Sequence, residues 1–95
     1  MSLYKVIIAD DEEELRNGII RKIDWFGNGF EVVGSAENGQ EAYELCEKYR
    51  PDLVITDIKM PFMTGLELGE KLYNKMPHTK VVIFSGFDDF EYAQR

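Results

Sequence analysis

The run from Leu53 to Thr56 is the feature that most narrows what this chain can fold into. Its residues are all apolar or β-branched, with no polar alternation, which indicates a strand covered on both faces. Strands of this kind occur in parallel sheets that carry helices on either side. The run ends at Asp57, and Pro61 soon afterwards indicates a loop, because the residue before a proline is pushed away from helical geometry. The pattern therefore predicts an α/β fold with a carboxylate where a buried strand ends.

The rest of the chain alternates short apolar runs with amphipathic stretches. Strands are predicted over residues 4–9, 30–36, 53–56 and 80–84, and the stretches between them have apolar residues at helical spacing. A further helix is predicted to begin near residue 88. Strands that alternate with helices at this spacing pair in parallel through right-handed crossovers. The predicted fold is a doubly wound parallel sheet of four strands, with three helices and the start of a fourth.

Three of the predicted helices begin with a polar residue that is followed by glutamate three positions on, as in a capping box. The pairs are Asp11 with Glu14, Asn38 with Glu41, and Thr64 with Glu67. The expected inner faces are Leu15, Ile19 and Ile23 in the first helix, Ala42, Leu45, Cys46 and Tyr49 in the second, and Leu66, Gly69, Leu72 or Tyr73, and Met76 in the third. Cys46 is interpreted as a packing residue of its stripe, not as a reactive thiol.

Size and charge exclude several classes of protein. Ninety-five residues allow one small domain, expected over residues 1–95. The net charge of −7 and the scattered basic residues argue against direct contact with nucleic acid. The longest apolar runs are far too short to cross a membrane. The single cysteine cannot form an internal disulfide, so the expected location is the cytoplasm.

Acidic residues follow two of the predicted strands. Asp10 and Asp11 come directly after residues 4–9, and Asp57 comes directly after Thr56. If the two strands are neighbours, their carboxylates converge at the edge of the sheet where α/β proteins bind ligands. Two carboxylates about 4 Å apart repel by roughly 4 kcal/mol at an effective dielectric near 20, so such a site takes up a proton or a cation. Oxygen ligands without a His/Cys cluster favour Mg²⁺ over zinc.

A carboxylate beside a bound cation can attack phosphorus and form an acyl phosphate, with catalysis by positioning and electrostatics. Ser85, after the last predicted strand, could donate a hydrogen bond to a phosphoryl oxygen, as could backbone N–H groups after Asp57. Either acidic feature alone is as often a solvated cap, and Asp11 is expected to cap the first helix. Together they favour a phospho-accepting site.

Three blocks of sequence resemble the receiver domain of two-component response regulators. They match that family in order and spacing over the whole chain, and they run from Ile8 to Glu12, from Val54 to Pro61 with Gly65 following, and from Phe84 to Gly86. The resemblance implies a flavodoxin-like sheet with the strand order 2-1-3-4-5.

The same resemblance implies roles for individual residues. Asp57 would be the phospho-acceptor, and Asp10, Asp11 and Asp57 would bind Mg²⁺. The backbone carbonyl of Lys59 would be a further metal ligand, and Ser85 would be the switch hydroxyl. A sensor histidine kinase would supply the phosphoryl group, and the face formed by the fourth strand and fourth helix would then change shape and control an output domain. The chain would be a signalling module and not an enzyme, beyond its own phosphorylation and dephosphorylation.

The stretch 85–93, together with Asp24 and Trp25, resembles receivers fused to AraC-type DNA-binding domains, so the expected output is transcription regulation. The family pattern continues with a fifth strand, a lysine at its end, a switch aromatic and a fifth helix, none of which precedes Arg95. The chain is therefore expected to be the N-terminal part of the domain. The uncovered edge of strand 80–84 predicts that the chain self-associates through that side or is unstable.

Two other functions remain open. A magnesium-dependent phosphohydrolase with an aspartyl nucleophile needs a second acid two residues after the nucleophile to protonate the leaving group. Lys59 holds that position, which counts against this function. The other alternative is an interaction module without phosphoryl chemistry. The intact acids and Ser85 argue against it, but the missing lysine leaves it open.

Overall fold

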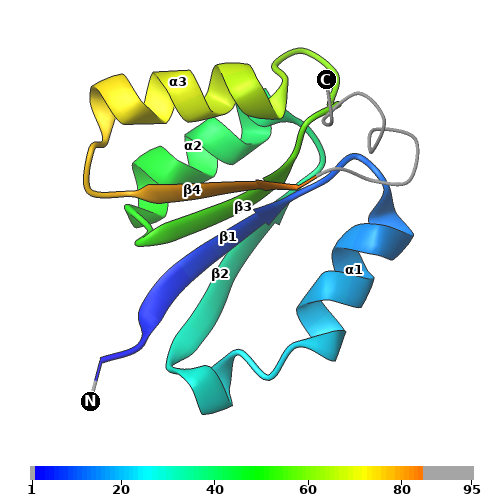
Figure 1. Ribbon diagram of the computed structural model, residues 1–95, viewed down its shortest axis with the longest axis vertical. Helices are drawn as coiled ribbons and strands as arrows, with labels where there is room; N and C mark the ends of the chain where they lie inside the picture. Colours follow the sequence, from blue (N-terminus) through cyan, green and yellow to red (C-terminus); the bar gives the residue numbers. More distant parts are fainter. Residues whose placement is uncertain (1, 85–95) are drawn as a thin grey trace.

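Four parallel strands form one sheet in the computed structural model, which describes residues 2–84 (Figure 1). The strands are β1 (Tyr4–Ala9), β2 (Phe30–Ala36), β3 (Leu53–Asp57) and β4 (Lys80–Phe84). Their order in the sheet is β2-β1-β3-β4. The prediction of a parallel sheet is confirmed, including the neighbouring positions of the first and third strands on which the site depends. The fourth helix predicted near residue 88 lies outside the described residues.

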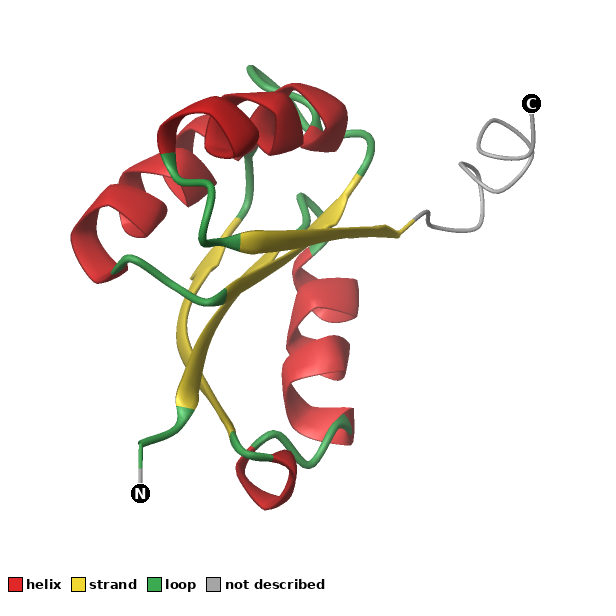
Figure 2. Cartoon of the chain, turned by 60° about the vertical axis from the view of Figure 1, so that its left-hand side comes forward, coloured by secondary structure: helices red, strands yellow, loops and turns green. Residues whose placement is uncertain are grey.

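Helices cover both faces of this sheet, as in a doubly wound fold. The helices are α1 (Glu13–Lys22), α2 (Gly39–Tyr49) and α3 (Gly65–Lys75), with a short 3-10 turn, η1 (Phe26–Asn28), before β2. Figures 1 and 2 show α2 and α3 together on one face and α1 alone on the other. Within residues 2–84, no helix has the length and apolar character needed to cross a bilayer.

The main core lies between the sheet and the pair α2 and α3. Ile7 and Val54 are register partners on β1 and β3, and both are buried against Leu68 and Leu72 of α3. Cys46 of α2 belongs to the same core, and desolvation raises the pKa of its thiol to about 12. A thiol with that pKa is protonated at neutral pH and is a poor nucleophile. The interpretation of Cys46 as a packing residue is confirmed.

Helix α1 packs less closely than its apolar pattern predicted. Its expected inner face includes Leu15 and Ile23, yet Leu15 is 43% exposed and Ile23 is similarly exposed. No residue of α1 is fully buried. The prediction of a buried stripe was wrong for these residues because α1 has no second helix beside it among the described residues, whereas α2 and α3 also cover each other.

Helix α3 is rotated relative to the predicted face. Leu72 and Met76 are buried as predicted, but Leu68 is buried as well, and Leu66, predicted to point inward, is 57% exposed. The reason lies at the first residue of the helix. A Cβ on Gly65 would overlap the backbone carbonyl oxygen of Asp57, so this side of the helix lies directly against the end of β3. Residues three and seven positions after Gly65 share that side and become the core face.

Two of the three predicted helix N-caps are confirmed, and one is not. Thr64 and Glu67 form both bonds of the predicted capping box, and the Asn38 side chain accepts a hydrogen bond from the Glu41 backbone N–H. Asp11 does not cap α1, so that prediction was wrong. The helix begins one residue later, and its N-cap residue, Glu12, has its N–H bonded to the Asp10 side chain.

Candidate functional site

The ends of β1 and β3 bring three carboxylates together. Ala9 and Thr56 are register partners in the two strands, so Asp10 and Asp57, the residues that follow them, lie side by side at the edge of the sheet. Asp10 is fully buried, Asp57 is 5% exposed and Asp11 is exposed. One carboxylate oxygen from each of the three residues lies within 4.8 Å of the other two. The sequence-based expectation that these acids converge is confirmed.

Asp10 has an incomplete set of hydrogen bonds. Its Oδ1 accepts a bond of 2.9 Å from the Glu12 backbone N–H, but its buried Oδ2 has no hydrogen-bond partner within residues 2–84. Burial raises the pKa of the Asp10 carboxyl above its ordinary value, and the neighbouring charge of Asp11 raises it further, although the bond from Glu12 acts in the opposite direction. A buried carboxylate oxygen without a partner is costly unless a proton or a cation reaches it.

Arg16 belongs to the same site, and the sequence-based reasoning missed it. Its Nη1 donates a hydrogen bond of 2.7 Å to the backbone carbonyl oxygen of Asp10. This bond ties the first turn of α1 to the turn that carries Asp10 and Asp11. A basic residue one helical turn after Glu12, in a stretch that is otherwise acidic, was the signal that could have indicated it.

The three carboxylates fit a hard divalent cation. Mg²⁺ binds oxygen ligands at about 2.1 Å, so opposite ligands lie about 4.2 Å apart. The 4.8 Å spread of the three oxygens is close to that span, and small side-chain movements would close the difference. A cation here would also satisfy the unpartnered Oδ2 of Asp10. Asp10, Asp11 and Asp57 could therefore hold Mg²⁺ at the carboxyl end of the sheet.

Asp57 is oriented by its own strand and by the loop that follows. Its Oδ1 accepts a hydrogen bond of 2.7 Å from the Ile58 backbone N–H. The loop closes on itself through a 2.8 Å bond from the Gly65 N–H to the Ile58 carbonyl oxygen. The side chain of Lys59 is exposed, and the metal-binding role of its carbonyl stays a prediction. Ser85, the predicted switch hydroxyl, lies outside the described residues.

A family model described as the response regulator receiver domain matches residues 6–95. The chain belongs to this family. Among curated proteins, this receiver domain is 44% identical over 92 residues to the transcriptional regulatory protein YesN of Bacillus subtilis, covering 97% of this chain and 25% of YesN. It is 40% identical over 94 residues to HptR of Staphylococcus aureus, a transcriptional regulatory protein, covering 97% and 36% of the two chains.

Solved structures support the same assignment. The receiver domain of AraT, a response regulator from Geobacillus stearothermophilus, is 43% identical with a TM-score of 0.90, and the match covers 97% of this chain and 71% of that one. A two-component transcriptional regulator AraC from Clostridium phytofermentans is 34% identical with a TM-score of 0.83, covering 98% and 71%. The receiver domain described here spans only a quarter to about a third of the curated relatives.

Gly65 is expected to be intolerant of even one added methyl group. In Gly65→Ala, the new Cβ would overlap the carbonyl oxygen of Asp57, so either α3 or the end of β3 has to move. We expect the free energy of unfolding to fall by about 1–3 kcal/mol, as measured by urea denaturation. Gly18→Ala in α1 is the matched control, because the added Cβ would meet no atom of residues 2–84 within 4 Å. That control should gain about 0.5–1 kcal/mol. Equal effects of the two substitutions would contradict the packing described for Gly65.

Proposed function

We propose that this receiver domain accepts a phosphoryl group on Asp57 from a phosphohistidine of a sensor histidine kinase. The observation that carries the proposal is the convergence of Asp10, Asp11 and Asp57, with one carboxylate oxygen of each within 4.8 Å of the others. Asp10, Asp11 and Asp57, with the backbone carbonyl of Lys59, would hold Mg²⁺. The bound cation would offset negative charge on the phosphoryl oxygens and help to align the reacting groups.

The chain's own residues supply the nucleophile and its orientation. An oxygen of the Asp57 carboxylate attacks phosphorus as the bond from phosphorus to the histidine nitrogen breaks. That nitrogen keeps the electron pair, and the product is an acyl phosphate. The hydrogen bond from the Ile58 N–H holds the Asp57 carboxylate in place. Ser85 would donate a hydrogen bond to a phosphoryl oxygen and so link phosphorylation to the face expected of β4 and the predicted fourth helix.

A small-molecule phosphodonor tests this function without a kinase. The chain is incubated with acetyl phosphate and Mg²⁺, and intact mass spectrometry measures any added phosphoryl group. We expect labelling of one site that requires Mg²⁺ and is lost in EDTA. Beryllofluoride, a phosphoryl mimic, should compete with this labelling. Absence of any covalent adduct, in this chain and in a version extended at its C-terminus, would overturn the proposal.

In the whole protein, we propose that phosphorylation controls an AraC-type DNA-binding domain and thereby transcription in the cytoplasm. The support is that YesN and HptR are named transcriptional regulatory proteins and that the similar AraC chain is a two-component transcriptional regulator. The receiver domain itself, with a net charge of −7, would not contact nucleic acid.

We also propose that the chain self-associates through β4. Within residues 2–84, β4 pairs with β3 alone and is an edge strand. Val82 on this strand is 50% exposed, and Ile83 is also exposed. An edge with unpaired backbone groups and apolar side chains favours pairing with a second copy.

The average sedimentation coefficient is expected to rise with protein concentration, as measured by analytical ultracentrifugation. Val82→Lys should suppress that rise, because a lysine at the edge opposes strand pairing. Phe26→Lys is the control, since Phe26 is an exposed residue of η1 beside β2, at the opposite edge of the sheet, and its substitution adds the same charge. A single monomeric species at all concentrations would contradict self-association.

A further inference from the structure

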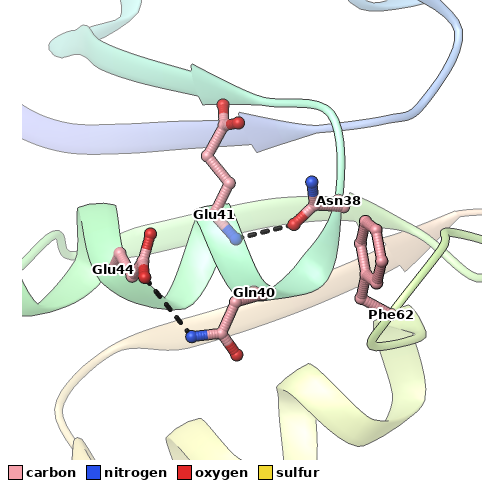
Figure 3. Close-up of a pocket in the computed structure, with 5 residues that line it drawn as sticks. All are labelled: Asn38, Gln40, Glu41, Glu44 and Phe62. Atoms are coloured by element: carbon pink, nitrogen blue, oxygen red, sulfur yellow. Dashed lines mark hydrogen bonds between the residues drawn. The ribbon is translucent and has the colours of Figure 1, made fainter.

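A hollow of about 510 Å³ lies beside the first two turns of α2, separate from the three aspartates (Figure 3). Its walls combine polar and acidic side chains of α2 and its cap with one aromatic ring from the loop between β3 and α3. The lining residues are Asn38, Gln40, Glu41, Glu44 and Phe62. The hollow therefore joins two segments that are distant in the sequence.

The ring of Phe62 is exposed, and the conformation of its turn fixes the position of the residue. Phe62 is 87% exposed and has a φ of 70°, a region that bulky residues rarely occupy. The turn is closed by a 2.8 Å hydrogen bond from the Met63 N–H to the Pro61 carbonyl oxygen. A Cβ on Gly39 would overlap the Met63 carbonyl oxygen, so the loop lies directly on the first turn of α2. Backbone contacts thus set where the ring lies relative to α2.

The hollow is negatively charged, because its lining includes two carboxylates and, in the described part of the chain, no basic side chain. In Figure 3, Gln40 lies between Glu44 and Phe62, whereas the side chain of Glu41 points away from the ring. The Gln40 amide donates a long bond of 3.4 Å to Glu44, and the Asn38 side-chain oxygen accepts from the Glu41 N–H. Glu44 can still accept further hydrogen bonds. A flat cation would match both this carboxylate and the negative face of an aromatic ring.

We propose that this hollow binds an arginine side chain of a partner protein. The guanidinium plane stacks on the ring of Phe62, and its N–H groups reach the Glu44 carboxylate and the Gln40 amide oxygen. Lysine fits less well, because its ammonium is a point charge without a stacking plane or a forked set of donors. The proposal does not depend on phosphoryl transfer, because none of these residues belongs to the aspartate cluster.

Peptide titration tests the proposal directly. The ¹⁵N-labelled chain is titrated with the capped peptide acetyl-Leu-Arg-Leu-amide, and amide chemical shifts are followed by NMR. A parallel titration uses the peptide with citrulline, which keeps the shape of arginine but has no charge. We expect saturating shifts at Gln40, Glu44 and Phe62 with the arginine peptide, and affinity lower by about fivefold or more with citrulline. No shifts at these residues, or equal affinity for both peptides, would overturn the proposal.

Two substitutions test separately how the ring of Phe62 and the carboxylate of Glu44 contribute to arginine binding. Phe62→Asn removes the ring but keeps a residue that tolerates a positive φ, so the turn is preserved. Glu44→Gln removes the charge at constant size. We expect each to weaken arginine binding by about fivefold or more. Glu47→Gln, an exposed position of α2 outside the hollow, should leave the affinity unchanged. Unchanged affinity in both Phe62→Asn and Glu44→Gln would overturn the proposal.

Discussion

Asp57→Asn is expected to abolish covalent phosphoryl attachment from acetyl phosphate and Mg²⁺. An asparagine has nearly the same size and can still accept the hydrogen bond from the Ile58 N–H, so the loop after β3 should keep its geometry. The neutral amide lacks the carboxylate oxygen that would attack phosphorus, and it also removes one of the three charges at the metal site. Labelling measured by intact mass should fall from about one phosphoryl group per chain to none.

Asp52→Asn provides the matched control for this result. Asp52 lies just before β3, at the opposite end of that strand from Asp57, and its Oδ2 accepts a hydrogen bond from the Lys5 N–H. The substitution removes the same charge far from the proposed metal site, so labelling should persist. Equal labelling of Asp57→Asn and the parent chain would show that another residue carries the phosphoryl group. Peptide mapping of the labelled parent chain would then identify it.

Asp10→Asn is expected to stabilise the metal-free fold while weakening Mg²⁺ binding. Among the described residues, the buried Oδ2 of Asp10 has no hydrogen-bond partner, and it lies beside the charge of Asp11. An asparagine keeps the oxygen that accepts from the Glu12 N–H and presents an NH₂ group that can donate toward Asp11. We expect the free energy of unfolding in EDTA to rise by about 1–2 kcal/mol. Mg²⁺ affinity, measured by calorimetry, should fall by more than about tenfold, because a charged oxygen ligand is lost.

The pH dependence of the free energy of unfolding follows from the direction in which the pKa of Asp10 is shifted. The pKa of this carboxyl is raised in the folded chain above its ordinary value of 3.8. Between the two values the folded state binds more protons than the unfolded state, so the stability that Asp10 contributes is complete below pH 3.8 and is lost as the pH rises through the folded-state pKa. Asp10→Asn removes this loss.

The gain from Asp10→Asn, measured by urea denaturation in EDTA, should therefore grow as the pH rises from 3 towards neutrality, which spans the ordinary carboxyl pKa of about 4. Asp11→Asn is the comparison, since Asp11 is exposed and should give a smaller gain. An Asp10→Asn variant that is less stable than the parent chain in EDTA would contradict the strained carboxylate described here. Unchanged Mg²⁺ affinity in Asp10→Asn would show that Asp10 is not a ligand of the metal.

Much of the fold and the central site could be predicted from the sequence because the relevant signals are local or follow from a simple topology. The four strands are marked by runs such as Leu53 to Thr56, and the caps at Asn38 and Thr64 depend on neighbours three residues away. Parallel strands end at one edge, so acids directly after the first and third strands had to meet once those strands were neighbours. The switch role of Ser85 and the metal-binding role of the Lys59 carbonyl come from family resemblance and stay predictions.

The tertiary structure alone decided which helix faces are buried and which side chains complete the two sites. The contact of Gly65 with the end of β3 rotates α3 toward Leu68, and the lack of a second helix beside α1 leaves Leu15 exposed among the described residues. The Arg16 side chain reaches the Asp10 carbonyl oxygen across the turn before α1. Phe62 comes to lie beside α2 because its loop packs on Gly39, a contact between segments that local patterns do not connect. Hydrophobic periodicity predicts that a helix forms and which of its sides is apolar. Which residues face the core depends on how the helix is rotated about its axis, and a few close contacts with distant residues set that rotation.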